Sequence, residues 1–310
     1  MTSFGKTSEV GQSTASVSNG WRADGRLCWS NGGGAPFVDI ERLSDQCLTC
    51  TPINVMVFIR MVTRHLIERE DGATVELFQA QAPGATPRGA ILFVHGYQAG
   101  LFMGAQQVVD RGALHRFSSG LNIIAAAVSQ PGFGASDGPA DFCGPSTQQA
   151  IIAALSFLKE QPYIDPGRIV LYGHSRGAIA SAMVATQVPD LGAVILSGGV
   201  YDFKAAFDSS SSGVRQAIQY EAGLSSEAFL ARSALYHTHE IRSKILILHG
   251  RQDDRAPVSQ AEIFAESLSD AEVPVTLSLF ECGHSIPREY LRGVLRPYLE
   301  QIFDPIVTSH

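Results

Sequence analysis

Short runs of apolar residues recur from about residue 61 onward, and more polar, helix-forming stretches separate them. Residues 90–94, Ala-Ile-Leu-Phe-Val, form a continuous apolar run, which is typical of a parallel strand buried on both faces. Two further runs, 62–68 and 74–81, are joined through Asp71-Gly72, a pair that favours a hairpin turn. The same pattern predicts the remaining strands at 121–128, 168–172, 193–197, 245–248 and 275–280.

The stretches between these strands carry helical patterns. Gly120 is expected to end a helix over 106–117. Ser146 is expected to cap a helix that continues to residue 159 and has its apolar residues on one face. Further helices are predicted at 178–187, 260–268 and 286–303, and parts of 203–243 are expected to be helical, with 209–212 as a mobile link.

Strands that alternate with helices imply a doubly wound, mainly parallel α/β sheet, and the mixed segment 203–243 is expected to form a small helical cap. Residues 61–310 would make up this domain. Residues 1–60 would be a partly flexible N-terminal extension, because the first 36 are rich in Ser, Gly, Thr and Asn.

Two features of the extension have open interpretations. Cys47 and Cys50 could form a redox or metal-binding pair, but structural or incidental cysteines are favoured, since no βαβ context and no second Cys/His pair accompany them. Residues 53–61 are apolar apart from Arg60 and could form a docking strand or a short helix.

Composition narrows the classes of function. The chain has 310 residues, of which 45% are hydrophobic, and a net charge of −7, which argues against a nucleic-acid-binding protein. No apolar run is long enough for a membrane span, and no basic-then-apolar leader is visible at the start. Five scattered cysteines fit a reducing compartment, so a cytoplasmic location without membrane association is expected.

The candidate chemistry centres on Gly173-His-Ser-Arg-Gly177, which directly follows the predicted strand 168–172. Strand, Gly-x-Ser-x-Gly and helix in that order form a nucleophile elbow, in which a strained turn exposes the serine at the edge of the sheet. Glycines at both ends avoid β-carbon clashes in this turn. Ser175 is therefore the predicted nucleophile.

Two further motifs follow predicted strands: His249-Gly-Arg-Gln-Asp253-Asp-Arg-Ala-Pro257, and Cys282-Gly-His284. With the elbow, they resemble the α/β-hydrolase family over about 61–305. That resemblance implies that Asp253 is the acid and His284 the general base, in the chain order Ser, Asp, His that the family uses. Asp202 and Asp254 remain alternatives for the acid.

The roles also follow from chemistry. An imidazole can take the serine proton and return it, and a carboxylate can fix the imidazole tautomer. The oxyanion needs two N–H donors, predicted to be the backbone N–H of Arg176 and that of Tyr97, which follows the strand ending at His95-Gly96. The other strand-end and elbow histidines, His95, His174 and His249, are expected to be structural.

Within the family, Gln161-Pro-Tyr-Ile-Asp-Pro-Gly-Arg168 and Asp253-Asp-Arg255 resemble the prolyl oligopeptidase-like and dienelactone hydrolase-like enzymes. This resemblance makes Arg255 a candidate contact to a substrate carbonyl. It implies no metal and no organic cofactor. The absence of a β-propeller and the Gly177-Ala178 pair, where those peptidases usually carry two glycines, favour a small esterase.

The expected activity is hydrolysis of a small carboxylic ester through an acyl-enzyme. An amidase or peptidase using the same three side chains is the alternative. A hydrolase fold retained as a binding module is the alternative of another class, but such proteins usually lose the serine or the histidine, and both are present here.

Overall fold

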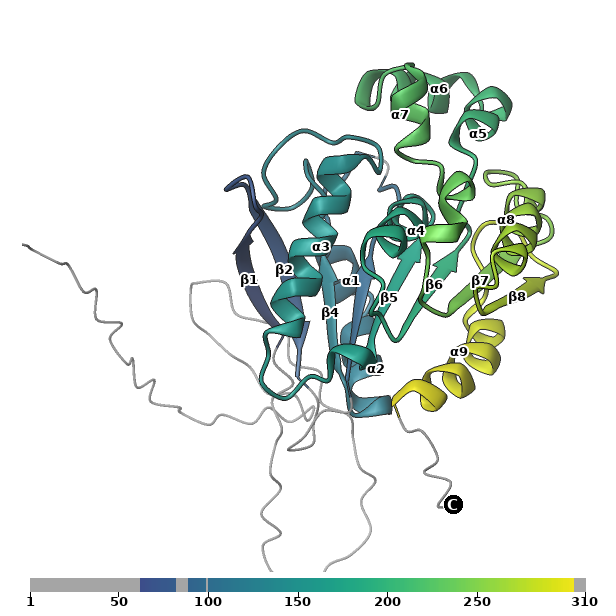
Figure 1. The fold of residues 1–310 in the computed structure, drawn as a ribbon. Helices are drawn as coiled ribbons and strands as arrows, with labels where there is room; N and C mark the ends of the chain where they lie inside the picture. The colour runs from purple at the N-terminus through teal and green to yellow at the C-terminus, as the bar shows by residue number, and fades with distance from the viewer. Residues whose placement is uncertain (1–61, 82–88, 99, 304–310) are drawn as a thin grey trace, which may run out of the picture. The chain divides into compact units, whose positions relative to one another are not determined.

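The computed structural model describes residues 62–81, 89–98 and 100–303. Within these residues, eight strands form one sheet in the order β1-β2-β4-β3-β5-β6-β7-β8 (Figure 1). The strands are β1 Val62–Glu68, β2 Thr74–Ala80, β3 Ala90–Val94, β4 Ile124–Val128, β5 Ile169–His174, β6 Ala193–Ser197, β7 Ile245–Gly250 and β8 Val275–Phe280. Every predicted strand is present.

The sheet is mainly parallel, as predicted. Strands β3 to β8 run parallel to one another, whereas β2 is antiparallel to both β1 and β4. All residues of β3, β4 and β6 are buried, which explains their uniformly apolar sequences. The carboxyl ends of β5, β7 and β8 therefore lie along one edge of the sheet.

Helices cover both faces of the sheet, and the alternation of side chains along each strand divides the core in two. In β3, Leu92 belongs to the core beneath α3 Pro145–Lys159, α4 Arg176–Gln187 and α8 Val258–Asp270. Phe93, its neighbour, belongs to the core on the face covered by α2 Ala113–Leu121 and α9 Arg288–Phe303. Figure 1 shows these two layers.

The prediction of one continuous helix over 106–117 is wrong. It is divided into α1 Gln106–Asp110 and α2, because Gly112 adopts a left-handed conformation with φ of 64°. Gly120 lies inside α2, which instead ends at Asn122 with φ of 51°.

The predicted cap of α3 is also wrong. Ser146 lies inside the helix, with Gly144 at the N-cap position and Pro145 as its first residue, where the missing N–H of proline costs nothing. The carboxylate of Asp141 accepts hydrogen bonds from the N–H groups of Ser146 and Thr147. Asp141 therefore does the capping that the sequence suggested for Ser146.

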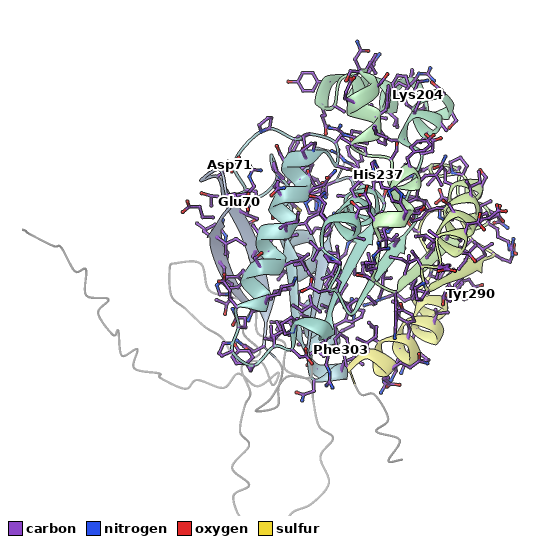
Figure 2. The ribbon with its side chains drawn as sticks, viewed as in Figure 1. Glu70, Asp71, Lys204, His237, Tyr290 and Phe303 are labelled. Carbon is purple, nitrogen blue, oxygen red and sulfur yellow. The ribbon has the colours of Figure 1, made fainter. Side chains whose placement is uncertain are left out.

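A small helical cap follows β6. It contains α5 Phe203–Ser209, α6 Ser212–Glu221 and α7 Ser226–Leu230, followed by the 3₁₀ segment η2 Ala234–Glu240. These helices stand above the carboxyl edge of the sheet in Figure 1, and Figure 2 shows Lys204 of α5 at the outer side of the cap. The short η1, Pro166–Arg168, leads into β5.

Among the described residues, no helix is both long and apolar enough to cross a membrane. The predicted N-terminal extension, including Cys47 and Cys50, lies outside the described residues. Its separation from the domain stays a prediction.

Candidate active site

Ser175 lies in a strained turn between β5 and α4. Its backbone has φ of 53° and ψ of −119°, a conformation that non-glycine residues rarely adopt. A β-carbon on Gly173 would lie 2.3 Å from the carbonyl oxygen of Gly177, and one on Gly177 would lie 2.2 Å from that of Val94. Only glycine at both positions allows the turn to pack this closely against β3.

Ser175, His284 and Asp253 form one hydrogen-bonded chain. The Nε2 atom of His284 lies 2.9 Å from Oγ of Ser175, and its Nδ1 atom lies 2.8 Å from Oδ2 of Asp253. The three residues come from the elbow after β5, the loop after β7 and the loop after β8. Because an ionised carboxylate can only accept, the proton belongs on Nδ1, which leaves Nε2 free to accept the serine proton.

Asp253 is held by donors on both carboxylate oxygens. Its side chain is fully buried, and Oδ1 accepts the N–H groups of Arg255 and Ala256, each at 2.9 Å. Burial raises the pKa of Asp253, but the hydrogen bonds from His284, Ala256 and Arg255 outweigh it and keep the pKa below its ordinary value. The carboxylate is therefore ionised at neutral pH.

His95 fixes the loop after β3. Its Nδ1 atom donates to the carbonyl of Gly96 at 2.9 Å, and its Nε2 atom accepts the N–H of Gln130 at 3.2 Å. The side-chain amide of Gln130 in turn donates to the His95 carbonyl at 2.6 Å. Burial lowers the pKa of His95 to about 4, so the ring stays neutral in this structural role.

This loop passes directly beside the nucleophile. A β-carbon on Gly96 would lie 3.1 Å from Cβ of Ser175, so the backbone of Tyr97 begins next to the elbow. The N–H of Arg176 belongs to the first turn of α4, where no intrahelical acceptor exists. Neither of these two N–H groups donates to another described residue.

The alternative acids have other positions. Asp202 accepts the N–H of Ala205 at the start of α5 and the hydroxyl of Tyr236 at 2.9 Å. Asp254 is exposed, and no hydrogen bond joins it to His284. The structure therefore pairs His284 with Asp253 alone among these carboxylates.

The remaining residues singled out in the sequence are also placed. His249 is buried, and its Nε2 atom donates to the carbonyl of Ala256 at 2.8 Å, which steadies the loop that carries Asp253. The ring of His174 packs 5.5 Å from that of His284. Arg255 is exposed, and its side chain forms no hydrogen bond or ion pair with a described residue.

The side chain of Arg176 has a role that the sequence analysis missed. It is buried and pairs with Glu221, at the end of α6, with 2.5 Å between Nη2 and Oε2. Its guanidinium also lies 4.1 Å from the centre of the Phe142 ring. Its partner Glu221 lies in a different segment of the chain, so no local sequence signal points to this pair.

No group of three or more histidine, cysteine or acidic side chains in the described part of the chain is arranged to hold a metal ion. Burial raises the pKa of the Cys143 thiol to about 11, so that cysteine is no candidate nucleophile. At this edge of the sheet, hydrogen bonds join a serine, an imidazole and a carboxylate.

Known proteins resemble this chain in sequence and in fold. Residues 143–292 match the prolyl oligopeptidase family model. Uncharacterized peptidase YtmA of Bacillus subtilis is 24% identical over 165 residues, which cover 52% of this chain and 64% of that protein. The chain thus spans less than two thirds of this relative.

Solved structures share the fold. A puromycin-hydrolyzing peptidase of Mycobacterium tuberculosis superposes with a TM-score of 0.63 and 20% identity, covering 82% of this chain and 40% of that one. The esterase Pf2001 of Pyrococcus furiosus superposes with a TM-score of 0.59 and 14% identity, covering 79% of this chain and 91% of that one.

The fold and the site thus define an α/β-hydrolase-fold protein. Over residues 143–292, the chain resembles the prolyl oligopeptidase-like serine hydrolases.

The buried histidines predict a loss of stability in mild acid. Burial, followed by the charges of His284 and Arg111, lowers the pKa of His174 to about 4, as burial does for His95. Between pH 6.5 and 4 the unfolded chain binds two protons that the native protein does not. The free energy of unfolding should therefore fall with decreasing pH, by up to about 1.4 kcal/mol per pH unit for each histidine.

Urea unfolding at pH 7, 6 and 5 measures this slope. His95→Gln should reduce it to about half, whereas the matched change His239→Gln, at an exposed ring, should leave it unchanged. A slope that is the same in His95→Gln as in the parent would contradict the assignment.

Proposed function

We propose that this chain hydrolyses the amide bond of a small, peptide-like substrate through an acyl-enzyme formed on Ser175. The observation that carries the proposal is the unbroken chain of hydrogen bonds from Ser175 through His284 to Asp253. This chain of hydrogen bonds begins at Ser175, which the strained turn and the close packing of its glycines hold at the edge of the sheet.

In the proposed reaction, His284 takes the hydroxyl proton through Nε2 as Ser175 Oγ attacks the substrate carbonyl. Asp253 stabilises the imidazolium across the Nδ1 hydrogen bond. The N–H groups of Tyr97 and Arg176 would receive the developing oxyanion. His284 then gives the proton to the departing amine, and a water molecule repeats the sequence to release the acid.

The choice of an amide rests on the comparisons. The matched family and the relative YtmA are peptidases by name, and one of the similar structures is a peptidase that hydrolyses puromycin. Hydrolysis of a small carboxylic ester, the activity expected from the sequence, is the second candidate function. The Pyrococcus furiosus esterase favours it, because this chain covers 91% of that protein.

The nucleophile can be tested by covalent labelling. A fluorophosphonate probe should modify Ser175 alone in the parent protein, and Ser175→Ala should abolish labelling and lower turnover by roughly a million-fold. Intact-protein mass spectrometry and peptide mapping locate the label. The matched control is Ser181→Ala, which changes a buried serine of α4. This variant should still be labelled at Ser175.

The acid can be tested by comparing two isosteric changes. Asp253→Asn should lower kcat by about 10,000-fold, because an amide at this position leaves His284 in the wrong tautomer. Asp202→Asn keeps an acceptor for the N–H of Ala205, and Asp202 has no contact to His284, so this change should lower kcat far less. A larger loss in Asp202→Asn would place the acid after β6 instead.

The bond type can be tested by matched substrates. Aminoacyl p-nitroanilides and the corresponding p-nitrophenyl esters should both be hydrolysed, and Ser175→Ala should abolish both. Arg255→Ala should lower kcat/KM for a dipeptidyl anilide, which offers a second carbonyl, more than for acetate esters, which do not. Hydrolysis of the esters alone would reject the amide proposal and leave the esterase.

A further inference from the structure

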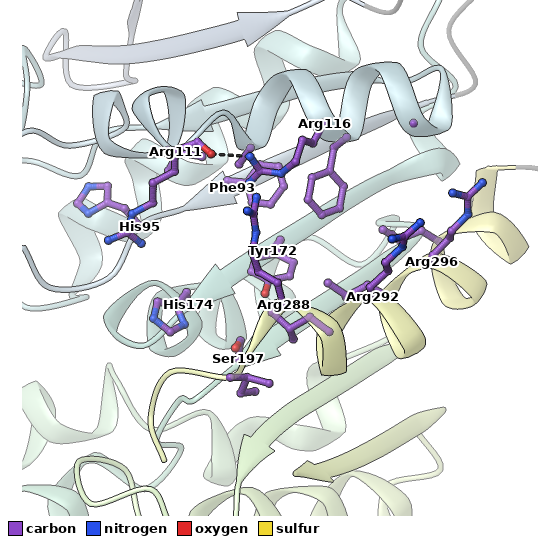
Figure 3. Close-up of a pocket in the computed structure, with 18 of the residues that line it drawn as sticks. Phe93, His95, Arg111, Arg116, Tyr172, His174, Ser197, Arg288, Arg292 and Arg296 are labelled. Atoms are coloured by element: carbon purple, nitrogen blue, oxygen red, sulfur yellow. Dashed lines mark hydrogen bonds between the residues drawn. The ribbon is translucent and has the colours of Figure 1, made fainter. Parts of the chain in front are cut away.

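A deep groove lies on the face of the sheet that α2 and α9 cover, away from the cap. Its volume is about 830 Å³, within the range of about 300–1,000 Å³ typical of small-molecule sites. Its lining contains none of Ser175, Asp253 and His284, although it includes their chain neighbours His174 and Ser285. Figure 3 shows the groove between the helix that carries Arg116 and the helix that carries Arg292.

The floor and one wall of the groove are apolar. Phe93 and Tyr172 come from the central strands β3 and β5, and Phe117 comes from α2. From α9, Leu291, Leu295 and Leu299 line the groove. Their spacing of four residues places them in one row along that helix, so the apolar wall runs the length of the groove.

The rim is strongly basic. Five arginines line the groove: Arg111, Arg116, Arg288, Arg292 and Arg296. Three of them repeat every four residues along α9, in a row beside the leucines. Glu289 is the one acidic residue in the lining, in a protein whose net charge is −7.

Most of these arginines have no acidic partner in the part of the chain that the structure describes. Of the five, only Arg296 has an ion pair with a described residue, Glu300 of the next helical turn. Burial, and then the nearby charge of Arg288, lowers the pKa of Arg116. Arg288 is also the first residue of α9, where the helix dipole disfavours a positive charge.

We propose that this groove binds a single-chain amphiphile with an anionic head group, a carboxylate or a phosphate monoester. The head group would lie between Arg116 of α2 and the arginine row of α9. Guanidinium groups bind carboxylates and phosphates through bidentate hydrogen bonds. The alkyl chain would lie along the leucine row and the aromatic floor. This site adjoins the proposed hydrolytic centre at Gly96 and His174, but its lining contains none of the three side chains of that centre.

Calorimetric titration of the full-length Ser175→Ala protein tests the proposal, because this variant cannot turn over an acyl ligand at the proposed centre. The probes are decanoate and decyl phosphate, with decan-1-ol and acetate as controls. One of the two anionic probes should bind with 1:1 stoichiometry, at least tenfold more tightly than decan-1-ol or acetate. The tighter of the two identifies the head group. Absence of saturable binding by both would overturn the proposal.

Two pairs of variants locate the site. Arg116→Gln/Arg292→Gln should weaken binding of the better probe at least tenfold. The control Lys204→Gln/Arg251→Gln, with the same change in net charge but outside the groove, should not. Equal weakening in both would show that only overall charge matters and would overturn the site.

The second pair tests the apolar part. Gly120 of α2 lines the groove and has no atom within 4 Å of where its β-carbon would be, so Gly120→Phe should fill the groove and weaken binding at least tenfold. Gly293→Phe is the matched control, since Gly293 of α9 has equally open surroundings but lies outside the lining. Binding unchanged in Gly120→Phe would overturn the placement of the chain, and with it the proposal.

Discussion

The lack of any side chain at Gly173 and Gly177 is the constraint on which the site depends. The carbonyl of Val94 lies where a β-carbon of Gly177 would have to be, so α4 can start against the end of β3. That close approach keeps Ser175 at a positive φ, a conformation that costs about 1–3 kcal/mol and persists only where packing enforces it. The conformation of Ser175 therefore depends on the packing of β3 against the turn and α4.

Three loops meet at this turn, and a histidine bonded to backbone groups steadies two of them. His95 ties the loop after β3 to Gln130, and His249 ties the loop after β7 to the carbonyl of Ala256. Both rings are buried and fully committed to these contacts apart from the Nδ1 atom of His249. His284 alone of the three joins the serine to a carboxylate, so the same residue type supplies both scaffold and proposed base.

Local patterns in the sequence are enough to predict the sheet and the elbow. Every predicted strand was found, because buried parallel strands have continuous apolar sequences such as that of β3. Errors occurred where two local signals competed. Ser146 is a good capping residue, but Pro145 can begin a helix and Asp141 reaches its free N–H groups. The helical pattern over 106–117 also contains Gly112, whose left-handed conformation divides the helix.

Relations between distant segments could not be predicted. Nothing in the sequence indicates that Glu221 lies against Arg176, or that the α9 arginines face α2 across an open groove. Such arrangements depend on the distances between packed helices. No short stretch of the sequence determines those distances. The hydrogen bonds to Asp253 within its own loop are local by contrast, because the N–H groups of Arg255 and Ala256, two and three positions later, supply them.

The pairing of Arg176 with Glu221 has a consequence for how this protein could be re-engineered. Arg176 carries a backbone N–H beside Ser175 and a buried cation whose one ion pair among the described residues is with Glu221 of the cap. Exchanging residues 203–230 for the cap of another hydrolase would remove that carboxylate and leave the guanidinium buried without a counter-charge. A chimera would have to retain an acidic residue at position 221, or replace Arg176 with an uncharged side chain in the same step. The cap and the elbow of this protein therefore have to be exchanged or kept together, although 45 residues separate Arg176 from Glu221.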